Sequence, residues 1–216
     1  MSIASLDGSA IPLAGPVTEA SAPPIERPWD GLKRFTVDEY HAMIKAGVFA
    51  EDTNFELLEG LIVRKMTKHP PHWIATGYLR DLLIAMNISG HFVHVQDPVT
   101  TNDSEPEPDL ALIRGDRRDF LGGNPDPAHA PLVIEVADSS LSQDRKWKKR
   151  IYARASVSAY WIVNLVDRQI EIYTKPSGPA EKPDFGDSRI VPESGEVAVV
   201  IDCKVVGQLK VSDLMP

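Results

Sequence analysis

Two acidic residues interrupt segments that otherwise have the composition of buried β-strands. Asp109 precedes the apolar run Leu110–Ile113, and Glu135 lies inside the apolar run Pro131–Ala137. Such runs are typical of strands that are buried on both faces. A carboxylate in this position costs free energy unless it is paired with a cation, protonated or bound to a metal ion. Two carboxylates on neighbouring strands can share one divalent cation.

The chemistry that such a pair supports is the hydrolysis of a phosphodiester. This reaction needs a nucleophilic water, stabilisation of the charge that develops at phosphorus, and stabilisation of the leaving oxygen. Mg²⁺ held by two carboxylates and several waters supplies water activation and Lewis-acid stabilisation. A lysine ammonium nearby can orient the attacking water or neutralise the developing charge. Two carboxylates and one lysine are therefore a minimal set for this reaction.

The lysine of this set is expected in a helix that the sequence predicts over residues 142–155. At about 100° per residue, the apolar stripe of this helix consists of Trp147, Ile151 and Ala155. Asp144 and Lys148 fall on or beside the stripe, so Lys148 is expected to face the sheet and reach the region of Glu135. The other basic residues point away from the stripe, and these are Arg145, Lys146, Lys149 and Arg150. A plain alternative is an ion pair between Asp144 and Lys148 one helical turn apart.

The helices and strands that must position these residues alternate irregularly along the chain. The sequence predicts helices over 36–46 and 72–86, a hairpin around Glu59-Gly60, strands over 92–99, 109–113 and 131–137, a second hairpin over 158–174, late strands over 196–203 and 205–211, and loops over 114–130 and 176–188. This order is not a regular βαβ alternation, and the sequence has neither a dinucleotide-binding fingerprint nor a phosphate-binding P-loop. We therefore expect a mixed α/β or α+β domain built around one sheet.

Composition limits the classes of partner. The chain has 216 residues and a net charge of −8, from 23 basic and 31 acidic residues, which argues against tight, passive coating of nucleic acid. It leaves room for an enzyme that meets DNA through one local basic face. The sequence has no apolar stretch that could span a bilayer and no secretory signal, so we expect no membrane partner. The single cysteine, Cys203, is consistent with a reducing cytoplasm.

The first part of the chain differs from the rest in composition. Residues 1–33 are rich in Ser, Ala, Pro and Gly and show no sustained periodicity, so we predict a disordered or arm-like tail. Residues 34–216 are then expected to form the folded domain.

The order of these residues resembles the Pro-Asp … (Asp/Glu)-x-Lys signature of restriction-endonuclease-like nucleases. More narrowly, the chain resembles the Uma-two family of this superfamily. In chain order, the matching segments are Phe55–Gly60, His72, Pro108-Asp109, Pro131–Val136 with a shift of one apolar residue, the set Asp144, Lys148 and Tyr152, and Tyr160–Val163. The resemblance covers residues 34–175. Each segment is a weak signal alone, and their common order makes the resemblance more specific.

The resemblance implies a restriction-endonuclease-like mixed β-sheet flanked by helices and a metal-dependent endonuclease that acts on DNA. It implies Mg²⁺ or Mn²⁺ at Asp109 and Glu135, with Glu56 as a third acidic ligand. Lys148 and His72 are the further catalytic residues that it implies. Because cutting both strands of DNA suits two sites, nucleases of this architecture often act as symmetric dimers, and we expect a homodimer.

One position departs from the superfamily signature. Ala137 stands two residues after Glu135, where the signature has lysine, and the resemblance implies that Lys148 on the following helix takes that role. The departure leaves a second hypothesis open, that of a catalytically inactive nuclease-fold protein acting as a nucleic-acid-associated binding or scaffold module. A third hypothesis is a metal-dependent hydrolase of small phosphoesters. For Glu135, a purely structural ion pair with Lys148 also stays open, as does an exposed strand position for Glu56.

Overall fold

The computed structural model describes residues 31–49 and 55–216, and its first element is the helix α1 (Val37–Lys45). The hydroxyl of Thr36 accepts a hydrogen bond from the amide of Glu39, and the Glu39 carboxylate accepts one from the amide of Thr36. This reciprocal pair is a capping box, which fixes the start of the helix that the sequence predicts over 36–46. The tail predicted over residues 1–33 lies almost entirely outside the described residues.

The predicted hairpin around Glu59-Gly60 is present and consists of β1 (Phe55–Leu58) and β2 (Leu61–Arg64). Glu59 and Gly60 have φ values of 50° and 75°, the left-handed conformation that a two-residue turn between twisted strands requires. A β-bridge between Leu57 and Glu105 joins this hairpin to the segment that precedes β4. The hairpin is thereby held next to the main sheet.

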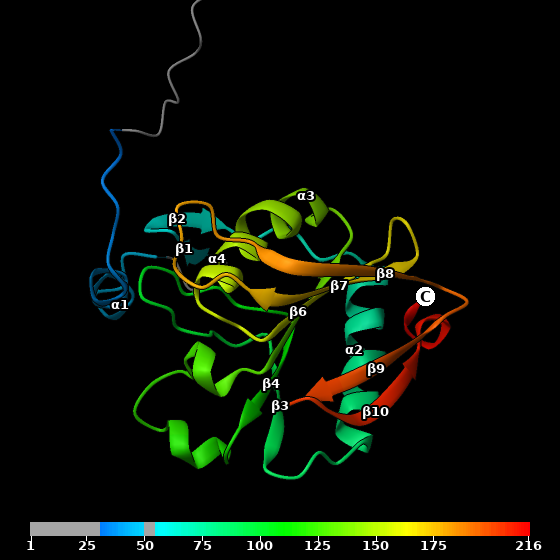
Figure 1. Ribbon diagram of the computed structural model, residues 1–216. Coiled ribbons are helices and arrows are strands. Elements are labelled where there is room, and N and C mark those ends of the chain that lie inside the picture. The colour runs from blue at the N-terminus through cyan, green and yellow to red at the C-terminus, as the bar shows by residue number, and fades with distance from the viewer. Residues whose placement is uncertain (1–30, 50–54) are drawn as a thin grey trace, which may run out of the picture. The chain divides into compact units, whose positions relative to one another are not determined.

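The main sheet has six strands in the order β3-β4-β5-β6-β7-β8 (Figure 1). Its strands are β3 (His91–Val95), β4 (Leu110–Arg114), β5 (Leu132–Ala137), β6 (Ala159–Asn164), β7 (Gln169–Pro176) and β8 (Phe185–Pro192). β5 and β6 are parallel, and the other neighbouring pairs are antiparallel. The sheet is therefore mixed, as expected.

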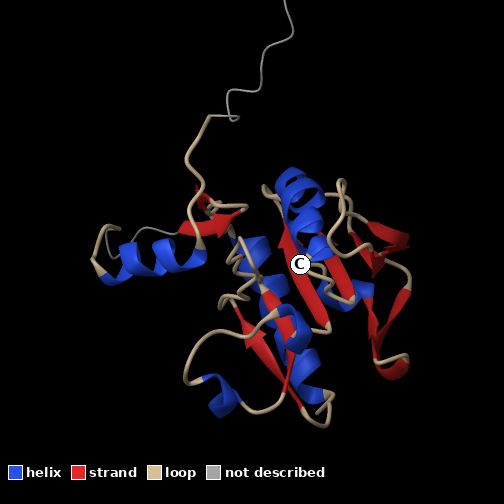
Figure 2. Cartoon of the chain, turned by 60° about the vertical axis from the view of Figure 1, so that its left-hand side comes forward, coloured by secondary structure: helices blue, strands red, loops and turns tan. Residues whose placement is uncertain are grey.

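Successive side chains of the central strands point to opposite faces, and each face has its own core. Leu110, Leu132 and Ile134 pack in one core with the helix α2 (Pro70–Ala85) and with the hairpin of β9 (Glu196–Ile201) and β10 (Lys204–Lys210). Val133 packs in the other core with residues of α4 (Lys149–Arg154). Helices thus flank both sides of the strands (Figure 2). By alternation, Glu135 faces α4.

The predicted helix over residues 142–155 is interrupted. It consists of α3 (Leu141–Gln143), a π-helical segment η3 (Asp144–Lys148) and α4. The prediction that Trp147 belongs to its apolar stripe is wrong, because Trp147 is 42% exposed, whereas Asp144 and Lys148 are buried. A π-turn has more residues than an α-turn, so the rotation of 100° per residue does not hold across this segment.

Two further expectations on strands are corrected. The loop predicted over 176–188 contains the start of β8, which the sequence did not reveal because its residues are mostly exposed and lack apolar alternation. The late strands β9 and β10 form a separate two-stranded sheet, so the domain is not built around a single sheet. Three short 3₁₀ helices complete the described elements: η1 (Arg117–Phe120), η2 (Pro127–His129) and η4 (Val211–Leu214). No helix within residues 31–49 and 55–216 is long and apolar enough to cross a membrane.

Candidate active site

The register between β4 and β5 brings the two interrupting carboxylates to the same end of neighbouring strands. Leu110 pairs with Ile134 at the end of the antiparallel ladder, and one further step along both strands leads to Asp109 and Glu135. The backbone hydrogen bonds between the two strands end there, because the side chain of Asp109 serves as the acceptor instead. Its Oδ2 accepts a hydrogen bond of 2.9 Å from the backbone amide of Val136. The two predicted carboxylates therefore belong to neighbouring strands and line the same cavity.

Asp109 is surrounded by donors. Its Oδ2 lies 3.0 Å from Nε2 of His72, and its Oδ1 lies 3.2 Å from Nζ of Lys68 and 3.4 Å from Nε2 of Gln96. Burial alone would raise the pKa of Asp109. The hydrogen bond and charge of His72, the charge of Lys68 and the Val136 amide outweigh burial and lower this pKa to about 2. Asp109 is therefore ionised at neutral pH.

His72 reaches Asp109 from the first turn of α2. Pro70 and Pro71 occupy the first two positions of that helix, where the missing amide protons have no helical acceptor. The hydroxyl of Thr76 donates a hydrogen bond of 2.8 Å to the carbonyl of His72 one turn later. The predicted site residue His72 thus lies at a fixed helix start and contacts the carboxylate directly.

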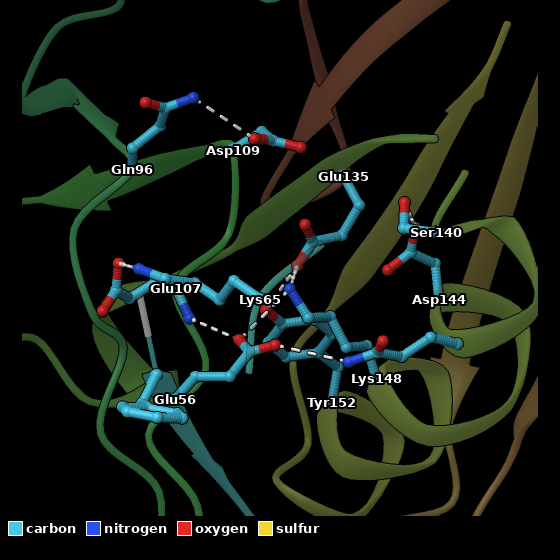
Figure 3. A network of polar contacts seen from close by, with 12 residues as sticks. Glu56, Lys65, Gln96, Glu107, Asp109, Glu135, Ser140, Asp144, Lys148 and Tyr152 are labelled. Atoms are coloured by element: carbon cyan, nitrogen blue, oxygen red, sulfur yellow. Dashed lines mark hydrogen bonds and ion pairs between the residues drawn. The ribbon is translucent and has the colours of Figure 1, made fainter. Parts of the chain in front are cut away.

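Glu135 is held by two donors from the helical segment that follows β5 (Figure 3). Its Oε1 accepts hydrogen bonds of 3.0 Å from Nζ of Lys148 and 3.0 Å from the hydroxyl of Tyr152. Burial raises the pKa of Glu135 well above its ordinary value, Lys148 opposes this rise, and the nearby carboxylates add to it. The predicted approach of Lys148 to Glu135 is therefore present in the structure.

Glu56 enters the same cluster from β1 and is buried, so its description as an exposed strand residue is wrong. Its Oε2 lies 3.3 Å from Nζ of Lys148 and accepts a hydrogen bond of 3.3 Å from the amide of Glu107. Its Oε1 accepts one of 3.4 Å from Nε2 of Gln143. Lys148 thus lies between two carboxylates that come from different sheets (Figure 3).

Ion pairs fix the hairpin that carries Glu56. Glu59, in the turn between β1 and β2, pairs with Arg150 and, at 3.0 Å, with Arg154. Both arginines belong to α4, the helix that follows Lys148. Arg150 therefore does not belong to a purely solvated face, because it helps to hold Glu56 beside Lys148.

All five predicted site residues line one cavity of about 50 Å³, together with Asp144 and the segment 65–68. Six acidic and three lysine side chains line it, which gives a formal charge of −3 when all six acids are ionised and histidine is neutral. They are Glu56, Glu107, Asp109, Glu135, Asp138, Asp144, Lys65, Lys68 and Lys148. Burial raises the pKa of Asp144 to about 6. Burial alone would lower the pKa of Lys148, but the surrounding carboxylates raise it well above its ordinary value. The cavity thus has an excess of negative charge.

This donor set fits a hard divalent cation such as Mg²⁺, which prefers carboxylate oxygens. No group of three or more His, Cys, Asp or Glu side chains within the described ranges is placed to hold a metal ion together. Mg²⁺ usually keeps several waters and is bound through one or two carboxylates, so a pair is sufficient. The excess negative charge also favours a cation.

Sequence reasoning missed several neighbours of the predicted residues. The ring of Tyr152 lies in the core, and its hydroxyl contacts Glu135; its position four residues after Lys148 was the available signal. Lys68 lies outside regular helices and strands and gave no periodic signal. Gln96 falls within the strand predicted over 92–99, but β3 ends at Val95, so its side chain could not be placed from strand alternation. The alternative ion pair between Asp144 and Lys148 does not form: Asp144 accepts a hydrogen bond of 2.6 Å from the hydroxyl of Ser140 instead.

Comparisons with known proteins identify a family and a similar fold. The model of the Uma2 family, described as "Putative restriction endonuclease", matches residues 37–201. The fold is similar to that of a crystal structure described as a putative nuclease belonging to DUF820 from Anabaena variabilis. That similarity has a TM-score of 0.63 and a sequence identity of 14%, and it covers 83% of this chain and 97% of the other. No functionally curated protein matches the sequence significantly. The family match spans most of the chain and confirms the resemblance seen in the motifs, and the protein therefore belongs to the Uma2 family.

Proposed function

We propose that the protein is a Mg²⁺- or Mn²⁺-dependent endonuclease that hydrolyses phosphodiester bonds in DNA. The family description and the nuclease neighbour support a nuclease. The observation that carries the proposal is that Asp109, Glu135 and Lys148 line one cavity, with the ammonium of Lys148 3.0 Å from the carboxylate of Glu135. These are the residue types that phosphodiester hydrolysis requires, and they come from adjacent strands and the helical segment that follows.

In this proposal, Asp109 and Glu135 would hold the divalent cation. Glu56 is not placed as a third ligand and would assist through its charge beside Lys148. When bound, the cation activates water and stabilises the developing negative charge as a Lewis acid. The low pKa of Asp109 suits a ligand, because the carboxylate is already ionised at neutral pH. The raised pKa of Glu135 means that a cation would bind in competition with a proton at that group.

The remaining residues would act through position and charge. Lys148 keeps its positive charge at neutral pH, because the surrounding carboxylates raise its pKa, and it would neutralise charge on the reacting phosphate or orient the attacking water. His72 contacts Asp109 Oδ2 at 3.0 Å and fixes the orientation of that carboxylate. Tyr152 does the same for Glu135 through a hydrogen bond of 3.0 Å.

The direct test is cleavage of supercoiled plasmid DNA by the pure protein, with Mg²⁺ or Mn²⁺ and with EDTA. We expect cleavage only with metal, and a loss of at least about a hundredfold in Asp109→Asn and Glu135→Gln, as is typical when a central electrostatic group is removed. Glu193→Gln is the matched control, because Glu193 is an exposed carboxylate paired with Arg168 outside the cavity. Cleavage that survives both cavity substitutions would rule out the assignment.

The same assay separates the other two hypotheses. Activity on a model phosphodiester but not on DNA would indicate a hydrolase of small phosphoesters. Binding of DNA without any cleavage would indicate the inactive binding or scaffold module. Homodimer formation stays a prediction that light scattering can test, and the single cysteine supports a reducing, cytoplasmic setting for the activity.

A further inference from the structure

The two oxygens of Asp109 have different kinds of partner. Oδ2 is bound by two buried groups, Nε2 of His72 at 3.0 Å and the backbone amide of Val136 at 2.9 Å. Oδ1 faces Lys68 at 3.2 Å and the side-chain amide of Gln96 at 3.4 Å, which is a long hydrogen bond. Because its contacts are weaker, Oδ1 is the oxygen that can change its partner.

Lys68 and Lys148 are the two lysines that contact the predicted metal ligands, and their surroundings differ. The side chain of Lys148 is 8% exposed and lies between Glu135 and Glu56. The side chain of Lys68 is 38% exposed and belongs to the segment 65–69, which has no regular secondary structure between β2 and α2. A long side chain with its ammonium at the edge of a cavity can move into solvent at little cost, whereas a buried one cannot.

We propose that Lys68 is the counter-ion of Asp109 in the metal-free protein, that a divalent cation displaces it, and that the released ammonium then binds a phosphate of the nucleic acid. The inference rests on the proposed function and adds a residue to it. The exchange replaces one cation by another on Oδ1 and forms or breaks no covalent bond. Lys68 would then occupy the cavity edge, where the backbone of a nucleic acid can approach.

This exchange couples two binding events. While Lys68 pairs with Asp109, it opposes metal binding and is not available to phosphate. Once the cation is bound, the ammonium is free, so metal should strengthen binding to nucleic acid, and nucleic acid should strengthen binding of metal by the same factor. A lysine that only packs against Asp109 would produce no such coupling.

The first experiment measures Ca²⁺ affinity by calorimetry in the absence of DNA. We expect Lys68→Met to bind Ca²⁺ about fivefold more tightly than the wild type, which is the upper end of the contribution of a partly exposed ion pair. Lys65→Met is the matched control, because Lys65 lines the same cavity but pairs with Glu107. It removes the same charge without freeing Oδ1, so its increase in affinity should be smaller. Asp109→Asn should lose Ca²⁺ binding.

The second experiment measures binding of a short DNA duplex with Ca²⁺ and with EDTA, and the duplex is checked for integrity on a gel. We expect Ca²⁺ to strengthen binding severalfold more in the wild type than in Lys68→Met. In EDTA the two proteins should bind the duplex nearly equally, since Lys68 is then engaged by Asp109. With Ca²⁺ present, the slope of log K against log salt concentration should be less steep by about 1 in Lys68→Met than in the wild type, because one phosphate contact is lost. Circular dichroism confirms that each variant is folded.

The outcomes separate the inference from the proposed function. If Asp109→Asn abolishes Ca²⁺ binding but Lys68→Met and Lys65→Met have equal effects, the metal site stands and the exchange is refuted. If Lys68→Met weakens DNA binding equally with and without Ca²⁺, Lys68 contacts phosphate but does not exchange, and the inference again fails. If the folded wild type and Lys68→Met both fail to bind any divalent cation, the inference and the proposed function fall together.

Discussion

Nζ of Lys148 lies 3.0 Å from Oε1 of Glu135, and both side chains are buried. Burying two charges costs several kcal/mol per ion before their attraction is counted, so a well-packed apolar pair would often be at least as stable. The same lysine also contacts Glu56 at 3.3 Å, so a single ammonium serves two buried carboxylates. Stability alone therefore does not account for these buried charges, whereas the proposed function does.

Removal of Lys148 tests this relationship. Lys148→Met leaves Glu135 without a counter-ion, and we expect it to lower the free energy of unfolding by about 3 kcal/mol at pH 8 without metal. The loss should be smaller at pH 5, because burial raises the pKa of Glu135 and the carboxyl can protonate instead. Urea unfolding at both pH values measures this difference. An equal loss at both would contradict it.

Asp144 makes the metal-free protein sensitive to pH. Its pKa is raised from 3.8 to about 6, so the folded state binds the proton more tightly than the unfolded state does. This contribution to stability is complete below pH 4 and is lost as pH rises through 6, in total about 3 kcal/mol. As the pH rises from 4 to 7 in EDTA, the free energy of unfolding of Asp144→Asn should therefore increase relative to that of the wild type. A difference in free energy of unfolding that stays constant with pH, measured by urea unfolding, would refute this.

His72 is expected to stabilise the folded protein at low pH through its contact with Asp109. The pKa of Asp109 is lowered to about 2, so its ionised form contributes stability that is present above pH 4 and lost as pH falls through 2, about 2 kcal/mol in total. His72→Ala removes a major cause of the lowered pKa. We expect the midpoint of acid unfolding to move to higher pH in this variant. An unchanged midpoint would show that His72 does not stabilise the carboxylate.

Tyr152→Phe isolates the hydroxyl that contacts Glu135. We expect it to lower the free energy of unfolding by about 1–2 kcal/mol, because a buried acceptor loses a donor. It should also weaken Mn²⁺ binding, since Glu135 loses its orientation. Tyr160→Phe is the control, because that buried hydroxyl donates to the backbone carbonyl of Asp144 at 3.2 Å. If the two variants change Mn²⁺ affinity alike, Tyr152 has only a structural role.

Much of the fold could be predicted from local patterns. The capping box at Thr36, the Glu59-Gly60 turn and the apolar runs around Asp109 and Glu135 each specify one local conformation, and all are present. The edge strand β8 could not be predicted, because its exposed side chains give no apolar alternation. The separate sheet of β9 and β10 could not be predicted either, since a strand pattern does not identify its partner.

The candidate site could be predicted from the free-energy cost of burying carboxylates rather than from a periodic pattern of residues. Carboxylates in buried strands need partners, and this requirement predicts Asp109, Glu135 and Lys148 from the sequence alone. The contacts of Lys68 and Gln96 with Asp109 depend on the path of segments without periodicity, so no sequence rule indicated them. The exposure of Trp147 depends on a π-turn that the 100° rotation of an α-helix does not describe.

The central claim is that Asp109 and Glu135 bind one divalent cation beside Lys148. The most direct test is a crystal structure of the protein soaked in Mn²⁺, with the ion located by its anomalous scattering. We predict a Mn²⁺ peak in this cavity, in contact with carboxylate oxygens of both residues and absent from Asp109→Asn crystals. A well-occupied Mn²⁺ bound elsewhere, with this cavity empty in the wild type, would contradict the account.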